Sequence, residues 1–334
     1  MSVYIPKNYT SILDLMETQQ AIKFVKDTFE RKLAEKLNLT RVSAPLFVRE
    51  SSGLNDNLSG IEKPVSFHIN AFPDSIEIVQ SLAKWKRMAL NKYRFLPESG
   101  LYTDMNAIRK DETLDNLHSL YVDQWDWERV ILPNDRNVAY LEQIVRKIVK
   151  AIVETKELLN ERFSGLKETI EEEVFFITSE QLLQKYPHLS AKERENAICR
   201  EKKTVFIIGI GDKLSNGSRH DLRAPDYDDW QLNGDILVWY DPLGQAVELS
   251  SMGIRVDARS LRYQLQVTNT LERLQYPFHR DVSEENLPLS IGGGIGQSRL
   301  CLVMLEKAHI GEVQASLWPE EDLKILKDHG IMIL

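Results

Sequence analysis

The stretch "HSLYVDQWDWERV", residues 118–130, predicts a β-strand whose two faces differ in chemical character. Side chains alternate between the faces of a strand, so every second residue shares a face. One face carries an aromatic set that is typical of a buried surface: Tyr121, Asp123, Trp125 and Trp127. The other face carries a mostly polar set: Val122, Gln124, Asp126 and Glu128. What this polar face binds is the first question that the sequence raises.

Composition is that of a globular protein and limits the classes of partner. The chain has 334 residues, 43% of them hydrophobic and 28% charged, which is enough for one large domain or two ordinary ones. Lys and Arg number 42 and Asp and Glu number 50, so the net charge is −8. Such a chain lacks the broad basic surface of a general nucleic-acid binder, and we expect no nucleic-acid partner.

The expected location is the cytoplasm. Two cysteines, Cys199 and Cys301, are too few for a disulfide framework and favour a reducing compartment. The opening residues, "MSVYIPKNYTSILDL", lack a basic segment followed by an apolar stretch, so no signal peptide is expected. No apolar run reaches the roughly 18 residues of a membrane span, and we expect no membrane partner.

Hydrophobic periodicity predicts two long amphipathic helices, over residues 19–38 and 137–163. Shorter helices are expected at 81–93, 179–186, 190–203 and 259–275. The glycine-rich residues 290–296 are expected to form a loop that opens a last helix.

The expected strands recur along the chain without regular βαβ alternation. They cover 39–48, 65–69, 76–81, two strands within 100–130, 173–178, 204–211 and a hairpin over 234–251. This pattern indicates an α+β fold, with a mostly antiparallel sheet flanked by helices. No repeat or linker interrupts it, so we expect one domain over residues 1–334 with a helical insertion around 137–205.

The glycine run "GGGIGQSR", residues 292–299, superficially suggests a dinucleotide-binding fold. That fold needs a βαβ unit and an acidic residue about 20 positions later, whereas only about 35 residues remain here. A tight turn from a strand into a helix is the simplest interpretation. Arg299 favours phosphate binding instead, because N–H groups at a helix start attract phosphate and a guanidinium adds a charged fork.

Three further clusters are ambiguous when each is taken alone. Arg109 lies in the charged stretch "IRKDE", which is typical of a solvated turn. Asp235 and Glu248 lie on the two strands of the expected hairpin, where they could share a hard divalent cation or form a polar surface. Ser81 and Lys86 lie in "SLAKWKR", on a helix face that is usually only solvated.

In this order, the clusters resemble the catalytic domain of class II aminoacyl-tRNA synthetases of the aspartyl type. The helix and strand over 19–48, with Pro45, resemble the dimer-interface element of that family, and Arg109 resembles the arginine of its strand–loop–strand unit. Its closing glycine strand and arginine-bearing helix are matched by Gly294, Gly296 and Arg299. The matching region begins near residue 19, which leaves no room for an anticodon-binding domain.

Over nearly its whole length the chain is similar to ammonia-dependent asparagine synthetases, the aspartate–ammonia ligases. The similarity rests on the patterns "DNLSGIEKPV", "QSLAKWKR", "YVDQWDWERV", "RAPDYDDW", "NGDILVW", "ELSSMGIRVDA" and "IGGGIGQSRL". It implies a single class II synthetase-like catalytic domain that forms a homodimer. Gln80 stands where the family usually has histidine, a departure that we expect to leave the site unaffected.

The resemblance implies that ATP, L-aspartate and ammonia give L-asparagine, AMP and pyrophosphate through a β-aspartyl-adenylate. The implied ATP-binding residues are Arg109, Asp235, Glu248, Gly294, Gly296 and Arg299. Among them, Arg109 would contact the α-phosphate and Arg299 the γ-phosphate and adenine. The two carboxylates would hold Mg²⁺ between phosphates. Such transfers depend on positioning and charge neutralisation.

The resemblance also implies an aspartate site made by Ser81, Lys86, Gln124, Asp126, Ser251 and Arg255. Gln124 and Asp126 would accept the ammonium group of aspartate, which gives the polar strand face a use. Lys86 or Arg255 would hold the α-carboxylate, because the β-carboxylate must be the one presented for activation. Glu128, on the same strand face, could belong to this site or simply pair structurally.

Ammonia must be deprotonated before it attacks, because ammonium predominates at pH 7 and the neutral amine is the nucleophile. Asp56, in "NDNLSG", is the candidate that accepts this proton. The alternative is that Asp56 only orders its loop through an Asx turn. With Arg109 and Lys86 it makes up the expected catalytic set. The loop over 212–230 has no assigned role, although its Asp221 or Asp228 could contact ribose.

Three other functions are disfavoured by particular features. A paralogue that aminoacylates tRNA would need the missing anticodon module and a less acidic chain. A catalytically inactive regulatory subunit would not need to retain every residue of the implied ATP site. A glutamine-dependent synthetase needs a cysteine nucleophile near its amino terminus, whereas Cys199 and Cys301 lie in patterns typical of packing residues.

Overall fold

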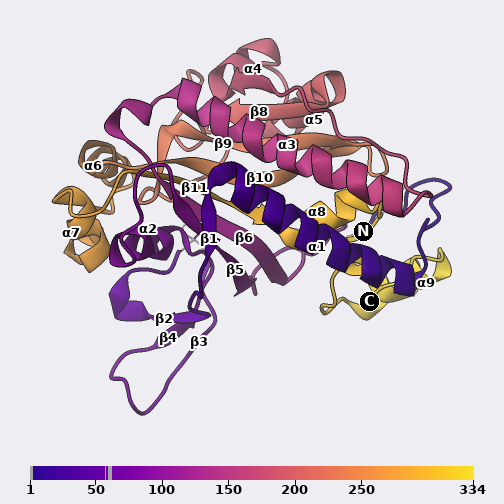
Figure 1. Ribbon diagram of the computed structural model, residues 1–334, viewed down its shortest axis with the longest axis horizontal. Coiled ribbons are helices and arrows are strands. Elements are labelled where there is room, and N and C mark those ends of the chain that lie inside the picture. Colours follow the sequence, from indigo (N-terminus) through magenta and orange to yellow (C-terminus); the bar gives the residue numbers. More distant parts are fainter. Residues whose placement is uncertain (1–2, 57, 59–61) are drawn as a thin grey trace.

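The computed structural model describes residues 3–56, 58 and 62–334. An eight-stranded sheet forms its central layer, and helices lie on both faces of the sheet (Figure 1). Across the sheet, the strands follow one another as β1 Leu39–Arg41, β5 Gly100–Ile108, β6 Tyr121–Val130, β11 Ser290–Gly296, β10 Gln245–Arg255, β9 Asp228–Tyr240, β8 Thr204–Ile208 and β7 Phe175–Thr178.

The two outer strand pairs, β1–β5 and β7–β8, are parallel, and the pairs between them are antiparallel. The expected α+β class with a mostly antiparallel sheet is therefore confirmed. The expected hairpin is the pair β9–β10, whose turn closes when Gly244 N donates to Asp241 O at 3.1 Å. A separate small sheet projects from the body (Figure 1) and contains β2 Phe47–Arg49, β4 Ile76–Ile78 and β3 Ser66–Phe67.

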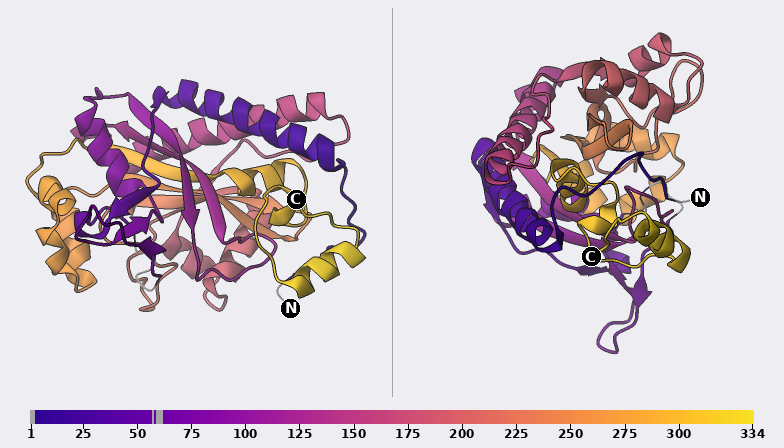
Figure 2. Two further views of the ribbon diagram at one scale, coloured as in Figure 1. Left: turned by 90° about the horizontal axis from the view of Figure 1, so that it is seen from below. Right: turned by 90° about the vertical axis from the view of Figure 1, so that its right-hand side faces the viewer.

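Helices α1 Leu15–Leu37 and α3 Val138–Arg162 lie side by side over one face of the sheet (Figure 2). The side chain of Asp14 caps α1 by accepting the backbone N–H of Glu17 at 2.8 Å. The apolar stripe of α1 faces the sheet, where the rings of Phe29 and Trp125 are 4.8 Å apart between centroids. Trp125 and Trp127 are 1% and 0% exposed, so the aromatic face of β6 is buried as expected.

Strand alternation gives the other face of the sheet its own cover. In β8, Phe206 packs into the core below α3, whereas Val205 and Ile207 pack on the opposite side with Ile198 of α5. Helices α4 Ser179–Lys185 and α5 Ala191–Lys202 cover this side over β8–β10, and α2 Ala83–Lys92 covers it over β5 and β6. The site described below lies on this face.

The remaining helices lie at the ends of the sheet. Helices α6 Ala258–Val267 and α7 Pro277–Ser283 lie near α2, and α9 Glu320–Asp328 lies near the C-terminus (Figure 1). Helix α8 Gln297–Met304 follows β11 directly and is buried in the main core. Among the residues that the structure describes, no helix has both the length and the apolar character that crossing a bilayer requires.

Three local predictions were wrong. The single strand expected over 39–48 is divided between β1 in the large sheet and β2 in the small one. The single helix expected over 259–275 ends at Val267, because Asn269 takes a left-handed φ of 56° and Pro277 opens the separate α7. The glycine run expected as a loop is instead strand β11, which pairs with β6 on one side and β10 on the other.

Candidate active site

The polar face of β6 borders a cavity of about 430 Å³. Strands β6, β10 and β11 contribute to it together with the start of α2 and the loops that contain Arg109 and Arg223. The sequence-predicted residues that line it are Asp56, Ser81, Lys86, Arg109, Gln124, Asp126, Glu248, Ser251, Arg255, Gly294, Gly296 and Arg299. Asp235 does not line the cavity. It is 5% exposed and forms an ion pair with Arg223, which does line the cavity.

The glycines of β11 make room for the side chains of β6. A Cβ on Gly292 would lie 2.0 Å from Glu128 Oε2, and one on Gly294 would lie 2.5 Å from Gln124 Oε1 and 2.8 Å from Asp126 Oδ1. Neither glycine has a positive φ, so space rather than backbone conformation requires them. Sequence reasoning missed this because the pairing of β11 with β6 joins segments about 165 residues apart.

Lys86 and Asp126 form a buried ion pair, with Nζ 3.0 Å from Oδ2. The same ammonium donates to Gly293 O at 2.9 Å. Burial lowers the pKa of Lys86 and outweighs the attraction of Asp126. Asp126 Oδ1 is buried without a hydrogen-bond partner, which leaves one carboxylate oxygen able to receive a donor.

The helix face that carries Lys86 could have been merely solvated, and the structure excludes that alternative. Lys84, Lys86 and Arg87 are 4%, 1% and 2% exposed. Lys84 pairs with Asp226 at 3.3 Å, and Arg87 Nη1 donates to Val256 O at 2.6 Å. The cations therefore anchor α2 inside the protein. On a three-charge face, sequence alone cannot distinguish solvation from burial with partners.

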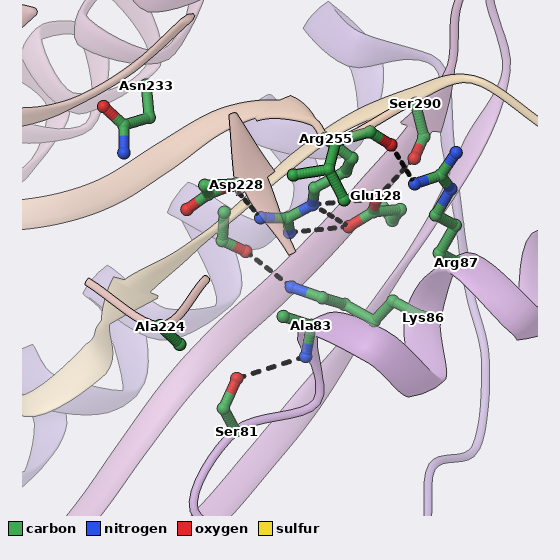
Figure 3. Close-up of polar contacts among 12 residues, drawn as sticks. Ser81, Ala83, Lys86, Arg87, Glu128, Ala224, Asp228, Asn233, Arg255 and Ser290 are labelled. Carbon is green, nitrogen blue, oxygen red and sulfur yellow. Dashed lines mark hydrogen bonds and ion pairs between the residues drawn. The ribbon is translucent and has the colours of Figure 1, made fainter. Parts of the chain in front are cut away.

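Arg255 lies between two carboxylates (Figure 3). Its Nε is 3.0 Å from Glu128 Oε1, its Nη2 is 2.7 Å from Glu128 Oε2, and its Nη1 contacts Asp228. Burial alone would raise the pKa of Glu128, but the charge of Arg255 lowers it overall. Ser290 Oγ also donates to Glu128 at 2.7 Å. Glu128 thus pairs structurally, which was one of its two possible roles.

Two arginines lie toward the start of β6: Arg109 follows Ile108, which pairs with Tyr121, and Arg299 comes three residues after Gly296, which pairs with Gln124. Arg109 follows β5, and its Nε is buried without a partner. Arg299, in the first turn of α8, donates from Nη1 to Glu248 O at 3.0 Å. The unpartnered Nε of Arg109 and the place of Arg299 at a helix start both suit phosphate oxygens.

The two serines expected near the substrate, Ser81 and Ser251, and the two loop aspartates also line the cavity. Ser81 Oγ accepts the backbone N–H of Ala83 at 3.1 Å (Figure 3), and Ser251 lies opposite Asp235 in the β9–β10 register. Asp221 and Asp228 both line the cavity. The loop over 212–230, which had no assigned role, therefore contributes to the wall of the site.

The carboxylates of Asp235 and Glu248 fit a divalent cation. Asp235 Oδ1 is buried without a partner, and its other oxygen contacts Arg223. Burial raises the pKa of Asp235 to about 7; Arg223 opposes this rise and the charge of Glu248 adds to it. Within the described residues no group of three or more potential ligands occurs. A cation here would take its remaining oxygen ligands from phosphates or water.

Asp56 is 2% exposed, and its Oδ2 has no hydrogen-bond partner. Burial raises its pKa to about 6, with Lys84 opposing and Asp226 adding to the rise. Its Oδ1 accepts the N–H of Leu58 at 3.0 Å, which is the Asx turn considered above. Gln80 Nε2 donates to Asp56 O at 2.9 Å, so the departure from histidine does touch a residue of the site, contrary to expectation.

Sequence reasoning missed several residues that line the cavity: Glu112, His118, Asp123, Arg223, Tyr227 and Gln314. His118 Nδ1 lies 2.8 Å from Asp115 Oδ1, and Arg223 contacts both Asp221 and Asp235. Only the stretch "RAPDYDDW", with its aromatic and charged residues in one loop, could have indicated Arg223 and Tyr227 in advance.

Sequence comparison identifies relatives over the full chain. A family model described as "Aspartate-ammonia ligase" matches residues 16–330. The aspartate–ammonia ligase of Clostridium tetani is 60% identical over 331 residues, which cover 99% of this chain and 97% of that protein. The corresponding protein of Lactobacillus johnsonii is 54% identical over 336 residues, with 100% of both chains covered.

Solved structures share the fold at low identity. The asparaginyl-tRNA synthetase of Pyrococcus horikoshii, complexed with asparaginyl-adenylate, has a TM-score of 0.64 and 17% identity, and the match covers 90% of this chain and 70% of that one. The aspartyl-tRNA synthetase of Entamoeba histolytica has a TM-score of 0.59 and 15% identity, covering 91% and 59%. These similarities show the class II synthetase fold alone.

Proposed function

This chain belongs to the aspartate–ammonia ligase family, the ammonia-dependent asparagine synthetases, and from that premise we propose how its residues carry out the reaction. The enzyme amidates L-aspartate with ammonia. The observation that supports our assignment most directly is one cavity whose lining combines a buried Lys86–Asp126 pair with the guanidinium-bearing residues Arg109 and Arg299.

The aspartate subsite lies over β6 and α2 in this proposal. The substrate ammonium donates to Asp126 Oδ1, the unpartnered oxygen, and to Gln124 Oε1. Lys86 holds the α-carboxylate, because two of its contacts are to Asp126 and Gly293 and one N–H is left to donate. Arg255 acts mainly by fixing Glu128 and Asp228, since its donors are already shared between them. Ser81 and Ser251 complete the wall.

The nucleotide subsite lies over the start of α8. Arg109 neutralises the charge that develops on the α-phosphate as the β-carboxylate of aspartate attacks it and pyrophosphate leaves. Arg299 contacts the γ-phosphate, and the backbone of Gly296 lets ATP approach β11 closely. Gly294, which was expected to serve ATP as well, makes room for Gln124 and Asp126 of the aspartate subsite. Asp235 and Glu248 would hold Mg²⁺, which supplies charge neutralisation between the phosphates when bound.

The second half of the reaction is attack of ammonia on the acyl-adenylate with departure of AMP. Asp56 binds ammonium through its unpartnered Oδ2 and accepts a proton, so that neutral ammonia forms next to the acyl carbon. A carboxyl whose pKa is raised to about 6 is a stronger base than an exposed aspartate. The Asx turn at Leu58 positions this carboxyl and is compatible with the chemical role.

The surroundings of the reaction follow from the same premise. We infer a homodimer that works in the cytoplasm as a single catalytic domain, with no nucleic-acid or membrane partner. The acidic chain, whose net charge is −8, and the residues that resemble the dimer-interface element of class II synthetases support this inference.

The test is a reaction with purified enzyme, ATP, Mg²⁺, L-aspartate and ammonium in the absence of tRNA. Formation of asparagine and AMP in equal amounts is expected. Aspartate-dependent AMP release that required an added acceptor such as tRNA would support the paralogue instead. No reaction at all with folded protein would support the inactive subunit.

A further inference from the structure

Helix α8 begins without a cap of its own. Its N-cap residue is Gly296, which has no side chain to accept the first N–H groups of the helix. The missing acceptor comes from a distant strand, because Asp123 Oδ1 of β6 accepts the backbone N–H of Ser298 at 3.0 Å. A carboxylate at a helix start is also favoured by the helix dipole.

Asp123 is held by a network that joins three further elements. Its Oδ2 accepts from Lys26 Nζ of α1 at 2.9 Å, and its Oδ1 accepts a second bond from Gln314 Nε2 at 3.2 Å. Gln314 Nε2 also lies 2.8 Å from Ser298 Oγ. Asp123, Ser298 and Gln314 are 6%, 3% and 5% exposed, so the network is buried.

The network lies next to the phosphate end of the cavity. Asp123, Ser298 and Gln314 all contribute to the lining of the cavity, as does Arg299. Arg299 follows Ser298 directly in the chain, and its guanidinium is held on the other side by Glu248 O. A shift of the first turn of α8 therefore moves the arginine relative to β10.

We propose that Asp123 is a positioning residue that fixes the first turn of α8 and thereby places Arg299 against the phosphates of ATP. The inference rests on the ATP contact proposed above for Arg299. Asp123 does not itself meet a phosphate, because two negative groups repel, and its own charge is paired with Lys26.

The alternation of β6 explains why one strand can serve both subsites. Gln124 and Asp126 point to the amino-acid end of the cavity, and Asp123 points to the opposite face of the strand, toward α1 and α8. Side chains from the two faces of β6 thus position both subsites, and this strand holds the two substrates close enough to react.

The experiment compares Asp123→Ala and Asp123→Asn by steady-state kinetics. Asp123→Ala removes the acceptor of the Ser298 N–H and is expected to raise KM for ATP roughly tenfold, while KM for aspartate changes less than about twofold. Asp123→Asn keeps an oxygen acceptor and is expected to restore KM for ATP to within about threefold of wild type. A role in folding alone would lower the melting temperature and leave both KM values unchanged, which would overturn the proposal.

Two further variants separate this inference from its premise. Arg299→Ala should raise KM for ATP, and adding Asp123→Ala to it should have less than about a twofold effect, because the two residues act as one unit. If Arg299→Ala leaves KM for ATP unchanged, the proposed ATP contact fails and the inference falls with it. If Arg299→Ala raises KM and Asp123→Ala does not, only the positioning role fails.

Glu154→Ala is the matched control, because Glu154 pairs with Lys32 and Lys36 of α1 and does not line the cavity. It should leave KM for ATP unchanged. Should Asp123→Ala not fold, Gln314→Leu removes donors to both Asp123 and Ser298 and is expected to raise KM for ATP roughly threefold. An unchanged KM in that variant would also contradict the proposal.

Discussion

At the scale of a single residue, a variant of Asp56 distinguishes the two steps of the reaction, adenylation and amidation. Asp56→Ala should preserve aspartate-dependent exchange of pyrophosphate into ATP, because adenylation consumes no ammonia and needs no base to deprotonate it. It should lower asparagine formation by at least about 100-fold, the range expected for loss of a general base. Both rates are measured with the same enzyme preparation.

Asp74→Ala provides the control for Asp56. Asp74 pairs with Arg49 in an ion pair outside the cavity, and its loss should affect neither rate. Equal loss of exchange and of amide formation in Asp56→Ala would indicate that the residue only orders its loop.

The raised pKa of Asp56 also predicts how stability depends on pH. The folded state holds this proton up to about pH 6, whereas an unfolded aspartate releases it near pH 4. The stabilising contribution is therefore complete below about pH 4 and is lost as the pH rises through about 6. Relative to Asp56→Asn, the ligand-free wild type should lose up to roughly 3 kcal/mol of unfolding free energy between pH 4 and pH 7.

Urea unfolding at a series of pH values measures this difference. The side chain at position 56 cannot ionise in Asp56→Asn. This variant is therefore the reference that accounts for all the other titrating groups of the wild type. Unfolding free energies of the two proteins that run parallel from pH 4 to pH 7 would show that burial does not hold the proton on Asp56.

Lys86 tests the orientation of the substrate. Lys86→Ala should raise KM for aspartate by roughly tenfold or more, because a charged hydrogen bond to the α-carboxylate is lost. KM for ATP should change much less. Lys92→Ala, at the exposed end of the same helix, is the matched control. An unchanged KM for aspartate in folded Lys86→Ala would remove this residue from the subsite.

At the scale of an element, the glycines of strand β11 leave room for the side chains of β6. In Gly294→Ala the new Cβ meets the ends of two flexible side chains, Gln124 and Asp126. These can move aside, so the fold should survive with a small loss of melting temperature. Because both proposed acceptors of the substrate ammonium are displaced, KM for aspartate should rise by roughly tenfold or more.

Gly234→Ala makes the contrasting change in the same sheet. Its Cβ would lie 2.2 Å from the backbone oxygen of Ile207, which cannot move without disturbing the pairing of β8 with β9. Gly234→Ala should lower the melting temperature more than Gly294→Ala does, which thermal unfolding measures. Equal effects of the two substitutions on KM for aspartate would contradict the assignment of Gly294 to the site.

At the scale of the whole molecule, the sequence predicted the fold class, the amphipathic helices and the buried tryptophan face, because these depend on periodicity within a single element. It also selected many of the residues that line the cavity, through patterns similar to those of a known family. It could not predict the partners of Lys84 and Arg87 or the network of Asp123, because those contacts join elements that are distant in the chain.

Errors arose where long-range pairing decides the structure. The glycine run reads locally as a loop and is a strand because it pairs with β6 and β10, while its glycines leave room for the side chains of β6. The helix expected over 259–275 breaks at Asn269, whose left-handed backbone no periodicity reveals. Glu128 and Arg255 both lie on the site face, but only the structure shows that they form an ion pair with each other.

The central claim is that the β-carboxylate of aspartate attacks the α-phosphorus of ATP within this cavity. Aspartate labelled with ¹⁸O in its β-carboxylate tests it, with mass spectrometry of the nucleotide product. We predict one ¹⁸O atom in each AMP formed, together with unlabelled pyrophosphate. Label in orthophosphate, accompanied by ADP, would contradict the account.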